Sequence, residues 1–435
     1  MKVLKFGETS IGSVERIKEM VQLIRNQAKI VVVFPAMPGV ADALKDISEY
    51  LYKKNPDGAN ELINQLEQQI ANHISSLYEA DSFRSKASAL LERQFGEIRS
   101  YTNDLFTLFE ERALTAQGVL ISTQLIQLYL EEQNINSVLL PALEFMRTDK
   151  NAEPDPQYIK EKLTQLIETY PEVAVFVTQG SICRNAYGEV DNLELGGDYS
   201  ASLIGVALRA EEIQIWSDVD TMLNNDPMYV KQTSPVRNLH YEEAAELAYF
   251  GAKILHPVCI LPARLNHIPV RLLNINRQDA LGTVISGQMD KGSIKAIAAK
   301  DNITMIRIKS GRMLLAYGFL RKVFEIFERY RTAIDLIVTS EVTVSVTIDN
   351  QKRLTEIVDE LKKYGTVTID NEMTIVCVVG DLKWNNVGFE SQIINAFKNI
   401  PVHIISYGGS DYNVSFLIKS IDKKDALQAL SDALF

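Results

Sequence analysis

The strongest constraint on the fold of this chain is an internal repeat in its last third. The pair Gly318-Phe319 recurs as Gly388-Phe389, and Val344-Ser345 recurs as Val414-Ser415, in both cases 70 residues later (388 − 318 and 414 − 344). Similarity at a fixed offset indicates two copies of one supersecondary unit. The apolar residues of each copy follow the order strand, helix, strand, strand, helix. The sequence therefore predicts two related α+β domains in this region.

The two copies differ in how they end. The first closes with a predicted strand at 366–369, whereas the second stops at the helix that contains Leu427 and Leu430, so its closing strand is missing. An apolar segment, Ile294–Ala298, precedes the first copy. We expect this segment to pair with the second copy, because an unpaired strand edge seeks a partner, so that the two small domains interleave. The expected bounds are 300–371 for the first small domain and 372–435 plus the strand 293–299 for the second.

The region before the repeats alternates between apolar strands and helices. Short apolar runs typical of buried strands occur at 30–34, 137–140, 173–177, 213–216 and 270–273. Helical periodicity is found at 200–209 and 241–254, and residues 61–133 are almost entirely helical in pattern. Strands that are apolar on both faces are typical of a parallel sheet covered by helices. We therefore expect one α/β domain with a mostly parallel sheet over residues 1–288.

Composition narrows the functional classes. The chain has 435 residues, enough for about three domains, and its 45 Lys and Arg against 56 Asp and Glu give a net charge of −11. This acidic balance argues against binding to nucleic acid or to an anionic membrane. Because no apolar run approaches the roughly 18 residues of a membrane helix, we expect a cytoplasmic protein. Cys183, Cys259 and Cys377 form no CxxC pair and the five histidines are scattered, so we expect no disulfide framework and no metal site of the protein's own.

Three local motifs accompany this layout. They are Lys5-Phe6-Gly7-Glu8-Thr9-Ser10, Trp216-Ser217-Asp218-Val219 and Phe250-Gly251-Ala252-Lys253-Ile254-Leu255-His256-Pro257. They resemble the Lys-Phe-Gly-Gly-Thr-Ser, Trp-Thr-Asp-Val and Phe-Gly-Ala-Lys-Val-Leu-His-Pro motifs of aspartokinases. The two repeats resemble the paired ACT domains of the same family, so the similarity covers the whole chain in order.

The resemblance implies a fold and an activity. The fold would be an amino-acid-kinase domain of the carbamate-kinase-like type, with three αβα layers, followed by two interleaved ACT domains of the βαββαβ type. The activity would be phosphorylation of L-aspartate to 4-phospho-L-aspartate with ATP and Mg²⁺, the first step of lysine, threonine and methionine biosynthesis. ACT domains of the family bind an amino-acid feedback inhibitor and help to build the dimer, so the resemblance also implies a homodimer.

The first motif fits the chemistry of phosphoryl transfer, which needs cations and backbone N–H groups around the γ-phosphate. A glycine after the first strand lets backbone amides approach a phosphate closely, and Lys5 can reach the transferring group. On spacing alone, Lys5 would be an ordinary lysine beside a strand. The resemblance assigns catalytic roles to Lys5 and Asp198, ATP-binding roles to Lys5, Gly7, Ser10, Ser217, Asp218 and Lys253, and substrate-binding roles to Thr9, Gly118, Gly196 and Gly197.

Several positions of the family's kinase site differ in this chain. Glu8 replaces a glycine beside the phosphates, Glu189 replaces an arginine that clamps the substrate α-carboxylate, and Val119 replaces a glutamate that holds the substrate amino group. Further hydroxyl and arginine groups are missing at Pro35, Ala41, Glu194–Asp198 and Met228. Loss of a bidentate arginine contact in a buried site is strongly unfavourable. The changes point to weak or absent phosphorylation of aspartate, or to another substrate.

The first ACT repeat, in contrast, matches the positions at which lysine-sensing aspartokinases hold their effector. Those positions are Met313, Gly318, Phe319, Leu320, Asp335, Ser340 and Glu341. The helix that starts at Gly318 offers free N–H groups to an effector carboxylate, and Asp335 and Glu341 can pair with its ammonium groups. Without the resemblance, Gly318 would be a turn glycine and the two acids would be solvated. We expect lysine as the effector.

Three functional hypotheses remain open. The first is an aspartokinase that acts on L-aspartate with an altered site. The second is a catalytically weak or silent paralogue that serves as an amino-acid-sensing regulatory subunit. The third is a kinase for another small amino-acid or carboxylate substrate. The retained Lys5, Asp198, Asp218 and Lys253 favour catalysis, and the missing arginines argue against it.

Overall fold

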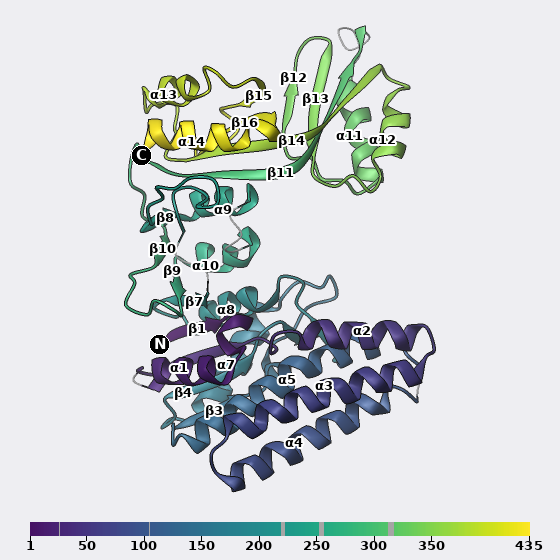
Figure 1. The fold of residues 1–435 in the computed structure, drawn as a ribbon, viewed down its shortest axis with the longest axis vertical. Helices are drawn as coiled ribbons and strands as arrows, with labels where there is room; N and C mark the ends of the chain where they lie inside the picture. The colour runs from purple at the N-terminus through teal and green to yellow at the C-terminus, as the bar shows by residue number, and fades with distance from the viewer. Residues whose placement is uncertain (26, 104, 219–221, 252–255, 312–316) are drawn as a thin grey trace. The chain divides into compact units, whose positions relative to one another are not determined.

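The computed structural model describes residues 1–435 with the exception of 26, 104, 219–221, 252–255 and 312–316. The chain divides into two compact units, which Figure 1 shows. The first unit comprises Met1–Thr221 and Val258–Gly287, and the second comprises Met222–Pro257 and Gln288–Phe435. Residues 1–288, expected as one kinase domain, therefore contribute a stretch to the second unit.

The first unit is built on a sheet with the strand order β3-β4-β2-β1-β7-β9-β10. Its strands are β1 (Lys2–Phe6), β2 (Ile30–Phe34), β3 (Ser137–Leu140), β4 (Val175–Gln179), β7 (Ile213–Ser217), β9 (Val270–Asn274) and β10 (Thr283–Ser286). Neighbouring strands are parallel from β3 to β9, and β10 is antiparallel to β9. Every residue of β2 and β4 is buried, as expected for strands covered on both faces. The mostly parallel sheet predicted from the apolar runs is confirmed.

Helices cover this sheet. They are α1 (Val14–Arg25), α2 (Val40–Tyr52), α3 (Pro56–Leu77), α4 (Asp81–Ser100), α5 (Leu108–Glu132), α6 (Ala142–Phe145), α7 (Pro156–Glu168), α8 (Gly196–Ala207) and α10 (Leu261–Leu265), with a 3₁₀ turn η1 (Glu8–Ile11) and a hairpin of β5 (Ile182–Arg184) and β6 (Val190–Asn192). The long helices α3, α4 and α5 lie side by side in Figure 1 and confirm the helical pattern predicted for 61–133. Their buried faces share one hydrophobic core with the sheet.

The second unit contains a sheet with the order β12-β13-β11-β14-β16-β15. The helices and strands of this unit, in chain order, are β8 (Asn238–His240), α9 (Tyr241–Tyr249), β11 (Ile294–Lys309), α11 (Phe319–Arg329), β12 (Ile337–Thr339), β13 (Thr343–Ile348), α12 (Leu354–Leu361), β14 (Thr366–Gly380), α13 (Phe389–Ala396), β15 (Val402–Ser406), β16 (Asn413–Lys419) and α14 (Lys423–Leu434). The helix predicted at 241–254 is shorter than expected and ends at Tyr249. The reason is that Gly251 has a φ of 112°, which cannot continue a helix.

The two repeats share the long strands β11 and β14. The first half of β11 pairs antiparallel with the second half of β14, where Ala298 lies opposite Cys377, and the remaining halves pair with Lys309 opposite Thr366. The segment Ile294–Ala298 thus lies beside the second repeat, which confirms the predicted interleaving. The equivalence of the copies extends to their first helices, because Gly318 and Gly388 both cap a helix with positive φ, 81° and 102°.

None of the described helices is long and apolar enough to cross a membrane. Among the same residues there is no group of three or more His, Cys, Asp or Glu side chains that could hold a metal ion. Cys183, Cys259 and Cys377 are free and buried. Burial raises the pKa of the Cys183 and Cys259 thiols to about 12, so both stay protonated at neutral pH.

Candidate functional site

The two predicted catalytic side chains meet in the first unit. Lys5 lies near the carboxyl end of β1, and Asp198 lies in the first turn of α8. The Lys5 ammonium nitrogen is 2.7 Å from Oδ1 of Asp198, and the two side chains are 16% and 22% exposed. Partial burial strengthens an ion pair because less water screens it, and a carboxylate at a helix N-terminus is stabilised by the helix dipole. The pair therefore fixes a cation at the end of β1.

The backbone that follows β1 lies against the end of β7. Gly7 N donates a hydrogen bond to Trp216 O over 2.8 Å. A Cβ added at Gly7 would lie 3.4 Å from that oxygen and 3.8 Å from Cα of Ser217. Because β1 and β7 are parallel neighbours, their carboxyl ends lie at one edge of the sheet. Lys5, Gly7 and Ser217 share this edge, which is where open α/β sheets bind their ligands.

The other residues predicted to bind ATP or substrate near this edge differ in accessibility. Thr9 and Asp218 are exposed, whereas Ser10 is buried. Ser10 N donates to Gly7 O, and the Ser10 hydroxyl has no hydrogen-bond partner among the described residues. Ser10 therefore belongs to the turn itself, and Thr9 and Asp218 are accessible to a ligand. Lys253 lies outside the described residues.

Close backbone packing brings the start of α8 beside Lys5. A Cβ at Gly197 would lie 3.3 Å from Cε of Lys5, and a Cβ at Gly180 would lie 3.0 Å from Cα of Gly197. Gly196 precedes this contact with a φ of 73°. The turn after β4 was missed by sequence reasoning, although a Gly180-Ser181 pair directly after a buried strand is a signal for it. Ser181 N donates to the Ser200 hydroxyl over 2.9 Å and so ties this turn to α8.

Gly118, another predicted substrate residue, is buried inside α5. A Cβ there would lie 3.1 to 3.3 Å from side-chain atoms of Ala36, Val40 and Leu44. The contacts that Gly118 makes are therefore packing contacts, and its role in substrate binding stays a prediction. The adjacent Val119 is buried as well.

Glu189, which by resemblance stands where the family has a substrate arginine, is exposed in the turn between β5 and β6. Its Oε2 accepts a hydrogen bond from Asn185 Nδ2 over 2.8 Å. Glu8, in η1, is exposed too. Both positions place negative charge on the surface of the first unit, which disfavours anionic substrates.

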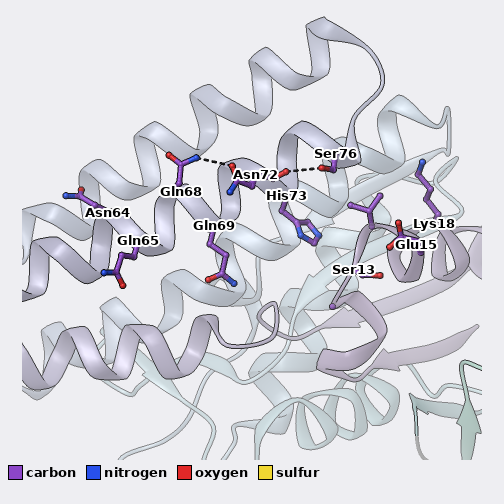
Figure 2. A pocket seen from close by; sticks show the side chains of 12 residues that line it. Ser13, Glu15, Lys18, Asn64, Gln65, Gln68, Gln69, Asn72, His73 and Ser76 are labelled. Carbon is purple, nitrogen blue, oxygen red and sulfur yellow. Dashed lines mark hydrogen bonds between the residues drawn. The ribbon is translucent and has the colours of Figure 1, made fainter.

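A pocket of about 1030 Å³, lined mostly by residues with polar side chains, lies between the start of α1 and one face of α3 (Figure 2). Ser13, Glu15 and Lys18 form one wall, and the other carries His73 and a row of amides: Asn64, Gln65, Gln68, Gln69 and Asn72. Burial lowers the pKa of His73, and its Nε2 has no hydrogen-bond partner among the described residues. The lining residues are different from the predicted catalytic and nucleotide-binding ones, so this pocket is distinct from the predicted kinase site.

The predicted effector residues of the second unit are divided between the two ends of β12. Asp335 N donates to Thr347 O, and Ser340 N donates to Thr343 O. Thr347 and Thr343 are separated by about 13 Å along an extended strand, so one chain holds Asp335 and Ser340 apart. The remaining positions are Gly318, which caps α11, Phe319, which is buried, Leu320 and Glu341, which are exposed, and Met313, which lies outside the described residues.

Asp335 is enclosed by groups that sequence reasoning missed. Its side chain is 1% exposed, and Oδ1 lies 2.6 Å from the ammonium nitrogen of Lys300. The hydroxyl of Tyr249 donates to the same oxygen over 3.1 Å. Burial raises the pKa of Asp335, and the hydrogen bond and charge of Lys300 offset part of that rise. Burial lowers the pKa of Lys300, but its hydrogen bonds to Asp335 and Asp349 outweigh this effect and the pKa is raised.

Comparison with known proteins agrees with this architecture. The model of the amino acid kinase family matches residues 1–274, and a model of the ACT domain matches residues 376–434. Aspartokinase 1, chloroplastic, of Arabidopsis thaliana is 33% identical over 100% of this chain and 80% of its own length. Lysine-sensitive aspartokinase 3 of Escherichia coli is 29% identical over 100% of this chain and 99% of its own length.

Solved structures agree as well. The crystal structure of E. coli aspartokinase III in complex with aspartate and ADP covers 100% of both chains with a TM-score of 0.82 and 28% identity. The aspartate kinase of Clostridium acetobutylicum shares the fold, with a TM-score of 0.86, 23% identity and 100% coverage of both chains. The fold and the matching family models thus define an amino acid kinase with ACT domains, and the predicted fold class is confirmed. Within that class, the chain belongs to the aspartokinase family.

Proposed function

We propose that this chain phosphorylates the side-chain carboxylate of L-aspartate with ATP and Mg²⁺, forming 4-phospho-L-aspartate, and that an amino acid bound to the ACT domains regulates the reaction. The observation that carries the proposal is the Lys5–Asp198 pair at the carboxyl end of β1. The close backbone approach at Gly7 and Gly197 supports it, because a γ-phosphate requires a cation and accessible backbone N–H groups together.

The residues of this edge have separable tasks. The Lys5 ammonium stabilises negative charge on the transferring phosphoryl group, and Asp198 holds that ammonium in place from the first turn of α8. Gly7 and Gly197 lack side chains, so a phosphate can approach the backbone beside Lys5. ATP supplies the phosphoryl group when bound. Mg²⁺ prefers carboxylate oxygens, and those of Asp198 and the exposed Asp218 are the donors that fit it at this edge.

The replaced substrate residues lead us to expect slow turnover. Glu189 is exposed and negatively charged where the family has an arginine, so it repels the α-carboxylate of aspartate instead of binding it. Arginine contacts to a transferring phosphoryl group are worth about 10³-fold or more in rate, and Met228 replaces one such arginine by resemblance. We therefore expect a low rate and weak binding of aspartate.

The activity can be tested by coupled ADP release with ATP, Mg²⁺ and L-aspartate, with hydroxylamine present to trap the acyl phosphate. Hydroxamate that forms only in the presence of aspartate supports the proposal. Hydroxamate from a different small carboxylic acid, with none from aspartate, would replace the substrate but keep the reaction class. ADP release that needs no acid at all would overturn the proposal.

A second candidate function is a catalytically weak or silent regulatory subunit. The exposed carboxylate of Glu189 and the buried Val119 favour it, because both positions lack the groups that would bind the main-chain ends of aspartate. This function predicts no hydroxamate from any acid, retained binding of lysine, and association with an active aspartokinase. Co-purification of the chain with such a paralogue, followed by assay of the mixture, separates this function from the first.

We also infer that lysine is the effector and that the second unit forms a homodimer. β12 is an edge strand whose three residues are all exposed, and an unpaired edge favours pairing with a second copy. Antiparallel pairing of two β12 strands would bring Asp335 of one copy near Ser340 and Glu341 of the other. Light scattering should give a dimer at micromolar concentration, and a stable monomer would contradict this inference.

A further inference from the structure

The side chains of Asp335, Lys300, Tyr249 and Asp349 form one cluster in the second unit. The ammonium nitrogen of Lys300, on β11, lies 2.6 Å from Oδ1 of Asp335 and 2.9 Å from Oδ2 of Asp349. The same nitrogen lies 4.6 Å from the centre of the Tyr249 ring. The Tyr249 hydroxyl, at the end of α9, donates to Oδ1 of Asp335. A helix, the shared strand β11 and both flanks of the β12–β13 pair are therefore joined by one polar cluster.

The two oxygens of Asp335 differ in their surroundings. Oδ1 contacts both Lys300 and Tyr249, whereas Oδ2 is buried without a hydrogen-bond partner among the described residues. A buried carboxylate oxygen without a donor is unfavourable and needs an explanation. The cluster also carries excess negative charge, because Asp335 and Asp349 share the single cation Lys300 within it. The ammonium group of a ligand would supply both the missing donor and the missing charge.

Tight packing ties this cluster to the end of α9. Tyr249 is the last residue of α9. Two residues further on, a Cβ added at Gly251 would lie only 2.4 Å from the backbone oxygen of Ala299, the neighbour of Lys300. Packed interiors transmit displacements because they contain little free space. A displacement of Lys300 would therefore also displace the end of α9.

We propose that Lys300 and Tyr249 are positioning residues of the effector site, which hold Oδ1 of Asp335 so that Oδ2 accepts the ammonium group of a cationic amino acid and which tie its binding to the end of α9. This inference rests on the proposed effector role of Asp335. Lys300 acts by keeping a buried carboxylate ionised, because a cation beside an acid favours its charged form. Tyr249 orients the same carboxylate through its hydrogen bond.

Isothermal titration of the full chain with L-lysine at pH 6.5, 7.5 and 8.5 tests this proposal. Lys300→Met should weaken lysine binding about tenfold or more at pH 6.5 and less at pH 8.5, since burial and the neighbouring Asp349 then raise the pKa of Asp335 without Lys300 to oppose them. Lys300→Arg should restore most of the affinity. Tyr249→Phe should weaken binding and remove the lysine-dependent change in hydrogen exchange at α9.

Two matched variants serve as controls. Lys363→Met removes an exposed lysine just after α12. Tyr330→Phe removes another tyrosine that donates to a carboxylate, here Glu360 over 2.7 Å. Both should bind lysine as the wild type does at every pH.

The outcomes separate this inference from the effector role on which it rests. If the wild type binds no lysine, arginine or ornithine, the effector role of Asp335 and this inference both fall. If the wild type binds lysine while Lys300→Met and Tyr249→Phe bind it equally well, only this inference falls. Tighter binding by Lys300→Met would also overturn it, because Lys300 would then compete with the ligand. Should Lys300→Met fail to fold, Tyr249→Phe and Lys300→Arg decide the matter.

Discussion

Each unit of the molecule contains a lysine–aspartate pair at its predicted site, and these two pairs differ in the burial of the aspartate far more than in length. Lys5 and Asp198 are 2.7 Å apart and both are partly exposed, at a sheet edge shaped by glycines. Lys300 and Asp335 are 2.6 Å apart with side chains that are 19% and 1% exposed, so here the carboxylate is buried although the lysine is as exposed as Lys5. A partly exposed carboxylate can exchange its cation for a ligand, whereas a buried carboxylate depends on the groups that surround it. Similar contacts therefore permit different roles, and we expect chemistry at the pair in the first unit and ligand recognition at the pair in the second.

The largest effect should follow from removal of Lys5. Lys5→Ala should lower the rate of hydroxamate formation by about 10³-fold or more, because the charge of the transferring phosphoryl group then lacks its cation. Lys2→Ala, on the same strand and with a side chain that is 40% exposed, is the control and should keep its activity. Steady-state rates with ATP and aspartate decide the point. If Lys5→Ala retains more than about a tenth of the rate, the exposed pair is not catalytic.

Removal of Lys300 should destabilise its unit more than removal of Lys5 destabilises the first unit. Lys300→Met should cost the second unit about 3 kcal/mol at pH 8, since it leaves the Asp335 carboxylate buried without its cation. Lys5→Met should cost the first unit about 1 kcal/mol or less, because Asp198 reaches solvent at a helix N-terminus. Urea unfolding, followed by hydrogen exchange on peptides of each unit, measures both losses. Equal losses would contradict the distinction between the pairs.

The stability lost in Lys300→Met should depend on pH. Burial raises the pKa of Asp335, and loss of Lys300 should raise it further. The folded variant then binds a proton more tightly than the unfolded chain does, so lower pH favours the folded state. The deficit of Lys300→Met relative to the wild type should therefore shrink between pH 8 and pH 5. A deficit that is constant over this range would mean that Asp335 is not the group left unpaired.

Much of the fold could be predicted because its signals are local. The offset of 70 residues and the missing last strand were enough to place Ile294–Ala298 beside the second repeat. The apolar runs were enough for a parallel sheet, although the strand expected at 173–177 lies at Val175–Gln179. The end of α9 was misjudged because apolar periodicity continues past a glycine whose positive φ stops the helix.

The site was predictable only in part, since its contacts join distant segments. Lys5 and Asp198 are 193 residues apart in sequence (198 − 5), and only the family resemblance brought them together. Lys300 and Tyr249 carried no motif at all. Their meeting with Asp335 depends on the register of β11 and on the packing of α9, which no local periodicity encodes.

Ligand binding in the second unit should be visible as stabilisation. Lysine should raise the melting temperature, because a ligand that binds only the folded state contributes about 2.7 kcal/mol at 100 times its dissociation constant. Threonine, which lacks a second ammonium group, should do less. Asp335→Ala and Glu341→Ala should each remove the shift, and Glu328→Ala, an exposed acid on α11, should keep it. A melting curve unmoved by millimolar lysine would reject the effector role.

The smallest expected effect concerns aspartate itself. Isothermal titration should give a dissociation constant weaker than about 100 μM, at the weak side of usual metabolite affinities, because Glu189 repels the substrate α-carboxylate. Glu189→Arg should tighten binding about tenfold, equivalent to roughly 1.4 kcal/mol, and Glu168→Arg, an exposed acid at the end of α7, should not. Tight binding by the wild type would show that other groups hold the substrate.

We expect that an effector bound to the second unit controls the chemistry of the first. Hydroxamate formation by the full chain, measured over a lysine titration for the wild type and for Glu341→Ala, tests it most directly. The wild-type rate should fall to a plateau over the same lysine concentrations that raise the melting temperature, and the Glu341→Ala rate should stay constant. A wild-type rate that lysine leaves unchanged while the melting curve shifts would contradict the claim.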